Sequence, residues 1–142
     1  MLASMARIFV GALVPLLVAA ACAAPAPEAD ITKGQIRADL KESAIALTST
    51  TVRPGQVTFI ARNIGTIAHD LIVIKTDLAA DKIPVDGQTQ KAKTDGRVDG
   101  VEEIPPGQSR NLRIDLPAGH YVVICNVPTH YQLGMHTELN VQ

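Results

Sequence analysis

The sequence predicts an all-β sandwich preceded by an N-terminal export signal. Short runs rich in Val, Ile and Leu recur along the chain and are separated by turns that contain Pro and Gly. No convincing helical period precedes the middle of the chain. Aromatic residues make up only 3% of the sequence and Trp is absent, so aliphatic side chains must build the core, with Phe59 and Tyr121 as its largest members.

The first residues have the layout of a secretory signal. Met1–Arg7 is short and basic, and Ile8–Ala21 is apolar but too short to span a bilayer comfortably. We therefore expect an exported protein, located in the periplasm or on the outer face of a membrane.

Cys22 ends a segment, Ala19–Cys22, that resembles a bacterial lipobox, although Ala19 stands where Leu is usual. In a lipoprotein this Cys becomes the lipidated first residue, and the Ala- and Pro-rich residues after it would act as a tether. Ordinary cleavage nearby, with Cys22 incidental, is the alternative. We expect a signal peptide over 1–22, of the lipoprotein type if Cys22 is modified, a tether over 23–34 and one domain over 35–142.

Eight short segments are expected to be strands, a number that suits a sandwich of two sheets. Turns with Pro and Gly at 53–56, 105–108 and 116–119 each come immediately before one of these strands. Strict alternation of polar and apolar residues in Asn111–Leu116 indicates one face in the core and one in water. The expected strands are Ile36–Leu40, Ser43–Leu47, Val57–Arg62, Asp70–Lys75, Val98–Ile104, Ser109–Leu116, His120–Cys125 and Thr137–Val141.

Thr76–Gly96 does not fit the strand pattern. This segment is rich in Lys, Asp, Gln and Thr, poor in apolar residues, and longer than a hairpin loop should be. We predict a surface excursion with one helical turn near Leu78–Lys82.

Composition excludes several function classes. Thirteen Lys and Arg residues stand against fourteen Asp and Glu residues, so the chain lacks the basic excess that nucleic acid binding requires. The sequence has no Ser-His-Asp order, no paired carboxylates in an apolar setting and no phosphate-binding glycine loop. We therefore expect neither nucleic acid binding nor enzymatic activity.

One short segment carries three side chains that bind metals. Cys125, His130 and Met135 lie at the end of a predicted strand and in the loop after it, where a loop can direct all three towards one point. His69 is distant in sequence but begins the apolar run Leu71–Ile74, whose strand could lie beside the one that ends at Cys125. Two His and one Cys in a plane, with a long bond to Met, suit a copper ion.

Each of these residues alone has an ordinary explanation. A lone Cys or Met is more often part of a core than a ligand, and a lone His is usually exposed or satisfied by hydrogen bonds. We apply that interpretation to His120 and His136, which lie outside the ligand spacing. Cys125 is the only Cys beyond the signal region, which argues against a disulfide in the domain. Taken together, the four candidates predict one bound copper ion.

The same residues resemble the cupredoxins, the plastocyanin- and azurin-like blue-copper proteins. The resemblance runs from about Ala44 to the C-terminus. It rests on the Cys-x4-His-x4-Met spacing with Gly134 before the Met, on Asn63-Ile64-Gly65 before the first His, and on Gly119-His120-Tyr121 entering the strand of the Cys.

This resemblance implies a Greek-key sandwich with one type 1 copper ion beneath one end. The equatorial ligands would be His69, Cys125 and His130, and the axial ligand Met135. Two positions depart from the family pattern. Asp70 replaces an Asn that usually ties the two ligand loops together, and Thr129 stands where Gly is common.

We expect a monomeric electron-transfer protein that passes single electrons to redox partner proteins, either a cytochrome or a membrane redox enzyme. Electrons would pass at the edge of His130, where Pro128, Tyr131 and Leu133 would form an apolar patch. A periplasmic protein that binds and delivers copper without a redox role is the main alternative. A β-sandwich interaction domain that makes no use of the ligand residues is a third.

Overall fold

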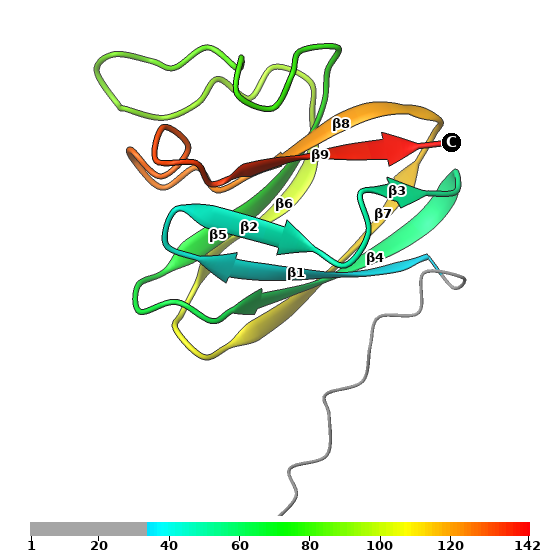
Figure 1. The fold of residues 1–142 in the computed structure, drawn as a ribbon, viewed down its shortest axis with the longest axis horizontal. Coiled ribbons are helices and arrows are strands. Elements are labelled where there is room, and N and C mark those ends of the chain that lie inside the picture. The colour runs from blue at the N-terminus through cyan, green and yellow to red at the C-terminus, as the bar shows by residue number, and fades with distance from the viewer. Residues whose placement is uncertain (1–33) are drawn as a thin grey trace, which may run out of the picture.

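Two β-sheets face one another in the computed structural model, which describes residues 34–142 (Figure 1). The sheets have the strand orders β2-β1-β4-β7 and β3-β9-β8-β5-β6, which confirms the predicted all-β sandwich. The described residues contain no helix that is long and apolar enough to cross a membrane. The strands are β1 (Gln35–Lys41), β2 (Ala44–Leu47), β3 (Thr51–Val52), β4 (Gly55–Asn63), β5 (His69–Lys75), β6 (Arg97–Ile104), β7 (Ser109–Leu116), β8 (Gly119–Ile124) and β9 (His136–Val141).

All eight expected strands are present, with ends that differ by at most two residues. The ninth strand, β3, was not predicted, because two residues carry no periodic signal and pair only with the C-terminal end of β9. The helical turn predicted at Leu78–Lys82 is a hydrogen-bonded turn and not a helix, with the Lys82 N–H donating to the Ala79 carbonyl at 2.9 Å. The predicted signal peptide, and the predicted tether except for its last residue, lie outside the described residues.

The pairing of β5 with β8 positions the candidate metal ligands. The two strands are antiparallel, with Ile72 opposite Ile124, although β6 and β7 separate them in sequence. The chain passes to the other sheet for β7 and returns for β8, as expected of a Greek key. The expectation that the strand of His69 lies beside the strand leading to Cys125 is therefore confirmed.

The core lies between the sheets and is mainly aliphatic. Phe59 and Tyr121 are its largest fully buried side chains, as predicted, and neither exposes any surface. In β7, Leu112, Ile114 and Leu116 point inward and alternate with exposed polar residues, which confirms the one-sided strand. The core includes Cys125 and Met135, so the site is continuous with it.

A second apolar cluster covers the outer face of β5 and β8. Ala80, Ile83 and Ala92 from the excursion, together with Tyr131, cover four strand residues on this face: Ile72, Ile74, Val122 and Ile124. The excursion lies next to the loop between β8 and β9 (Figure 1), and the Thr129 N–H donates to the Gln90 carbonyl. Most of the excursion is exposed, as predicted, but three of its apolar residues pack against the sheet, which was not predicted. Its few buried apolar residues follow no regular period, and no local pattern distinguishes them from exposed ones.

Candidate metal centre

The three strongest candidate ligands come from separate places in the chain and meet at one end of the sandwich. His69 is the first residue of β5, and Cys125 immediately follows β8. His130 lies in the loop between β8 and β9. Within the described residues, these three form the group whose side chains could hold a metal ion.

Their potential ligand atoms form a nearly equilateral triangle. The Nδ1 atoms of His69 and His130 lie 3.3 Å apart, and the Sγ of Cys125 lies 3.8 Å from the first and 3.4 Å from the second. A point equidistant from three atoms so separated is about 2 Å from each, close to the usual length of a bond from imidazole nitrogen to a metal ion. These three side chains would therefore fit a metal ion bound to all three atoms.

The thiol of Cys125 is fully buried and held by the backbone of the adjacent strand. The Asp70 N–H donates a hydrogen bond to its Sγ at 3.2 Å. Burial raises the pKa of the thiol to about 11, against opposing hydrogen bonds from the backbone of Asp70 and Val127. The metal-free thiol is thus protonated at neutral pH, and a bound cation would displace the proton.

The imidazole of His69 is also fully buried. Burial, and then the neighbouring His130, lower its pKa below the ordinary value. The ring is therefore neutral near pH 7, and neutral imidazole is the form that binds metals. His130 is only partly buried, whereas His69 and Cys125 are fully buried.

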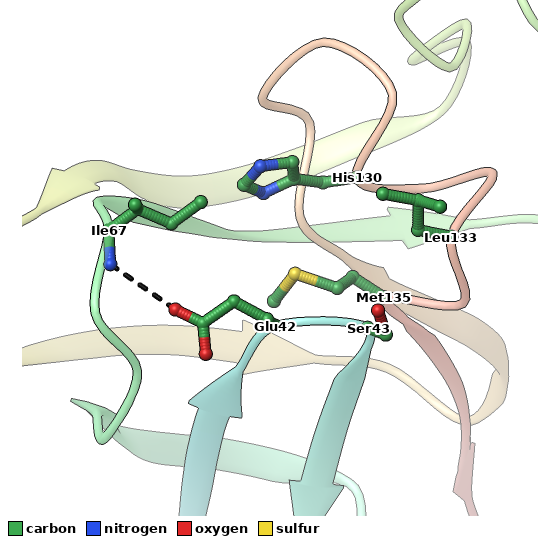
Figure 2. Close-up of a pocket in the computed structure, with 6 residues that line it drawn as sticks. All are labelled: Glu42, Ser43, Ile67, His130, Leu133 and Met135. Atoms are coloured by element: carbon green, nitrogen blue, oxygen red, sulfur yellow. Dashed lines mark hydrogen bonds between the residues drawn. The ribbon is translucent and has the colours of Figure 1, made fainter.

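Met135 lies beside this triangle and is 1% exposed. Figure 2 shows its side chain extending next to the His130 ring in a small hollow that Leu133 also lines. Two backbone bonds close the ligand loop: Cys125 N–H to the Met135 carbonyl at 3.0 Å, and Met135 N–H to the His130 carbonyl at 3.1 Å. Gly134 before it has φ of +106°, and a Cβ there would lie 3.0 Å from the Ser43 carbonyl oxygen.

The departure at Asp70 changes the contacts around the site without removing the bond to sulfur. Its Oδ1 accepts a hydrogen bond from the Glu103 N–H at 2.9 Å, which joins β5 to β6. Burial raises the pKa of Asp70, while bonds from the backbone of Glu103 and Asn126 oppose the rise. The Asn126 side chain pairs instead with the backbone of Ala92 in the excursion.

The departure at Thr129 has a conformational cost. Thr129 has φ of +71°, in the left-handed region that favours glycine. This explains why a glycine is a natural choice before His130. The Thr129 N–H donates to the Gln90 carbonyl at 2.9 Å, so a contact with the excursion supports this backbone conformation.

The apolar surface around His130 differs from the expectation in one residue. Tyr131 is 4% exposed, and its hydroxyl donates to the Ala80 carbonyl and accepts from the Ile83 N–H. The prediction that it belongs to the exposed patch was therefore wrong, because the excursion covers it. Leu133 is 61% exposed, and Ile67, which sequence reasoning missed, is 47% exposed beside the same hollow.

The two histidines outside the spacing behave as expected. The His120 ring is bonded on one side to the Thr76 carbonyl and on the other to the Glu138 carboxylate. The His136 ring packs against the ring of Tyr131, with centroids 5.1 Å apart. Neither residue points a ring nitrogen into the metal-binding group.

Sequence reasoning also missed Glu42, in the turn between β1 and β2. Its Oε1 accepts hydrogen bonds from the Thr66 N–H and hydroxyl and from the Ile67 N–H. The hydrogen bond from the Thr66 N–H is the main cause that lowers the pKa of Glu42 to about 2. The same oxygen lies 3.8 Å from the Nε2 of His69. Nothing in the local sequence marks this Glu, because its partners lie in another loop.

Comparison with known protein families agrees with the presence of a metal-binding group. Residues 34–142 match the model of the copper-binding proteins of the plastocyanin/azurin family. No curated protein matches the sequence.

Solved structures show the same fold at low sequence identity. The chain resembles dithionite-reduced auracyanin from the photosynthetic bacterium Roseiflexus castenholzii, with 22% identity and a TM-score of 0.59 over 77% of this chain and 97% of that one. For auracyanin B the identity is 21% and the TM-score 0.58, over 76% of this chain and 86% of that one. For rusticyanin from Thiobacillus ferrooxidans the values are 20% and 0.55, over 76% of each chain.

Proposed function

We propose that this chain, which belongs to the plastocyanin/azurin family of copper-binding proteins, carries single electrons by way of its one copper ion. The observation that carries this proposal is the buried triangle formed by two Nδ1 atoms and one Sγ atom. His69, Cys125 and His130 would hold the ion, with Met135 as a further, weaker ligand. Copper in such a ligand set supplies a one-electron couple between its two oxidation states.

The protein holds the ligand side chains in place before any electron arrives. The strand that begins with His69 is hydrogen-bonded to the strand that ends just before Cys125, and the Asp70 N–H donates to the sulfur. Met135 is held by its backbone bonds to Cys125 and His130. A site supported in this way need not rearrange when its charge changes, and a small rearrangement favours fast electron transfer.

Burial of the ligands keeps solvent away from the site. His69 and Cys125 expose no surface, and Met135 exposes 1% of its surface. Water therefore has little access to an open coordination position, which disfavours binding of a substrate at the metal. This argues for an electron carrier and against an enzyme. It also argues against the alternative of copper delivery, because handing over the ion would require these buried side chains to open.

The exposed surface next to His130 is the proposed point of electron exchange. Leu133 and Ile67 are exposed large apolar residues on this surface, and Pro128 is exposed on the same ligand loop. Exposed apolar surface of this kind is typical of a site for protein association. We propose that a cytochrome or a membrane redox enzyme docks there, outside the cytoplasm, as the export signal of the sequence suggests.

A spectroscopic experiment tests the proposal. Metal-free protein is titrated with Cu²⁺, and its visible absorption is followed through chemical reduction and reoxidation. We expect an intense thiolate-to-copper band at one equivalent that disappears and returns reversibly. Cys125→Ser is the control, and it should remain folded and colourless. A wild-type protein that stays colourless and binds only Cu⁺, releasing it to a chelating acceptor, would support delivery and overturn the proposal.

A further inference from the structure

One buried nitrogen atom at the metal centre lacks a hydrogen-bond partner. The Nε2 of His69 exposes almost no surface and has no partner among the described residues. Leaving a buried polar group unpaired is costly, and such groups usually have a specific explanation. When Nδ1 of an imidazole binds a metal ion, Nε2 carries the ring proton, and this buried N–H needs a hydrogen-bond acceptor. The missing feature is therefore an acceptor.

Glu42 is well placed to provide that acceptor. Its Oε1 lies 3.8 Å from the Nε2 of His69. The parallel pairing of β1 with β4 sets Leu40 opposite Asn63, which brings the turn after β1 next to the loop that leads to His69. Figure 2 shows the Glu42 carboxylate reaching from that turn to the backbone of Ile67. A carboxylate thus lies on the far side of a ligand imidazole from the metal position.

Gly65 leaves open the space between these two side chains. A Cβ added at this residue would lie 2.7 Å from the Oε1 of Glu42 and 2.9 Å from the Nε2 of His69. Any side chain at this position would press on both groups and displace the more flexible one, which is Glu42. The backbone of Gly65 does not have a positive φ, so the requirement for glycine here concerns space and not conformation.

We propose that Glu42 is a positioning residue for His69. In the copper-bound protein its carboxylate accepts the Nε2–H of His69, holds the ring with Nδ1 towards Cys125, and favours the more positively charged oxidation state of the ion. Carboxylates that accept a hydrogen bond from the ring N–H of a ligand histidine raise its basicity and fix its tautomer. The test of this inference by reduction potential rests on the proposed redox function, whereas its test by proton exchange does not.

Glu42 also holds the loop through Thr66 and Ile67, so a purely structural role must be distinguished from a role at the metal. Four variants separate the two. Glu42→Gln keeps an oxygen for the loop but removes the charge, and Glu42→Ala removes both. Gly65→Ala leaves Glu42 charged but forces it away from His69. Glu103→Gln removes a different exposed carboxylate near the site and serves as the matched control for net charge.

The first measurement is the reduction potential of each copper-loaded variant. We expect it to rise in the order wild type, Glu42→Gln, Glu42→Ala, with Gly65→Ala also above wild type. For Glu42→Ala we expect the ratio of Cu²⁺ to Cu⁺ affinity to fall about tenfold, which corresponds to about 59 mV for one electron. If Glu42→Gln and Gly65→Ala keep the wild-type potential, or if Glu103→Gln shifts it as much as Glu42→Gln, the proposal is wrong.

The second measurement is the nuclear magnetic resonance signal of the His69 Nε2–H in the Cu⁺-loaded protein, which is diamagnetic. We expect slow exchange of this proton with water in wild type, and fast exchange in Glu42→Ala and Gly65→Ala. This result does not require reversible redox behaviour. If the proton is equally protected in wild type and all four variants, Glu42 is not its acceptor, even where the copper couple is intact. If the wild-type protein shows no reversible copper redox couple, but its His69 Nε2–H exchanges slowly and the loss of Glu42 speeds that exchange, only the proposed function fails.

Discussion

The backbone N–H of Asp70 donates a hydrogen bond to the Sγ of Cys125 at 3.2 Å, and so joins the strand that begins with His69 to the residue that follows β8. This bond comes from the main chain and is therefore independent of the side chain at position 70. It explains how the sulfur stays oriented although Asp70 directs its carboxylate to the Glu103 N–H instead.

Replacement of Cys125 should reveal the energy of that bond in the metal-free protein. The hydroxyl of Cys125→Ser can still accept from the Asp70 N–H, whereas Cys125→Ala leaves this buried donor unpaired. We expect the Ser variant to be more stable than the Ala variant by about 1 kcal/mol in denaturant unfolding. Equal stability of the two variants would show that the bond contributes nothing measurable.

Removal of the Tyr131 hydroxyl should loosen the excursion. This hydroxyl donates to the Ala80 carbonyl at 2.7 Å and accepts from the Ile83 N–H at 2.9 Å, and both bonds are buried. Tyr131→Phe should lower the free energy of unfolding by about 1–3 kcal/mol and speed hydrogen exchange at the Ile83 amide. Tyr121→Phe is the matched control, because the Tyr121 hydroxyl donates to the Pro117 carbonyl and makes no bond to the excursion among residues 34–142, so its loss should leave Ile83 protected.

Introduction of a charge next to His130 should slow electron exchange with a protein partner. Leu133→Lys places an ammonium in the exposed apolar surface, which disfavours close docking. We expect the bimolecular rate constant of electron transfer with a cytochrome or a membrane redox enzyme to fall about tenfold. Stopped-flow kinetics at fixed ionic strength would measure it. Val98 is also exposed but lies near the end of β6 that is distant from His69. The Val98→Lys variant should therefore exchange electrons at the wild-type rate. If both variants react as wild type does, docking occurs elsewhere.

The pair of His120 and Glu138 should make stability depend on pH. The bond to the Thr76 carbonyl, followed by Glu138, raises the pKa of His120 above 6.5, and Asp77 adds to the rise. Hydrogen bonds, first from the Ala80 N–H, lower the pKa of Glu138 below 4.5. The contribution of His120 is complete below pH 6.5 and is lost as pH rises through its raised pKa. The contribution of Glu138 is complete above pH 4.5 and is lost as pH falls through its lowered pKa.

We therefore expect this pair to stabilise the fold most between about pH 4.5 and 6.5. Solvent screens the pair, so the contribution is about 1 kcal/mol or less. The measurement compares the unfolding free energy at pH 5.5 and 8.5 for wild type and Glu138→Gln, which keeps an acceptor for the Ala80 N–H. Wild type should lose more stability than the variant between these pH values. An identical loss in both would exclude the pair as the cause.

Much of the fold could be predicted because its signals are local. The alternation in β7 and the apolar run in β5 each follow from which faces of a strand are buried, and turns with Pro and Gly mark where strands begin. The loop that carries three of the candidate ligands could also be predicted, because Cys125, His130 and Met135 lie within one short segment at regular spacing. The run Leu71–Ile74 is continuous and not alternating because both faces of β5 are covered, one by the core and one by the excursion.

The sequence by itself thus determined the class of the fold, every strand except the two-residue β3, and the three side chains that meet in the metal-binding group, His69, Cys125 and His130. Only the tertiary structure decided that Tyr131 is buried, that the excursion completes a second apolar cluster, and that Glu42 faces His69. The physical reason is the same in each case. These contacts join segments that are far apart in sequence, and a Tyr in a loop or a Glu in a turn has the same local pattern whether it meets water or a distant strand.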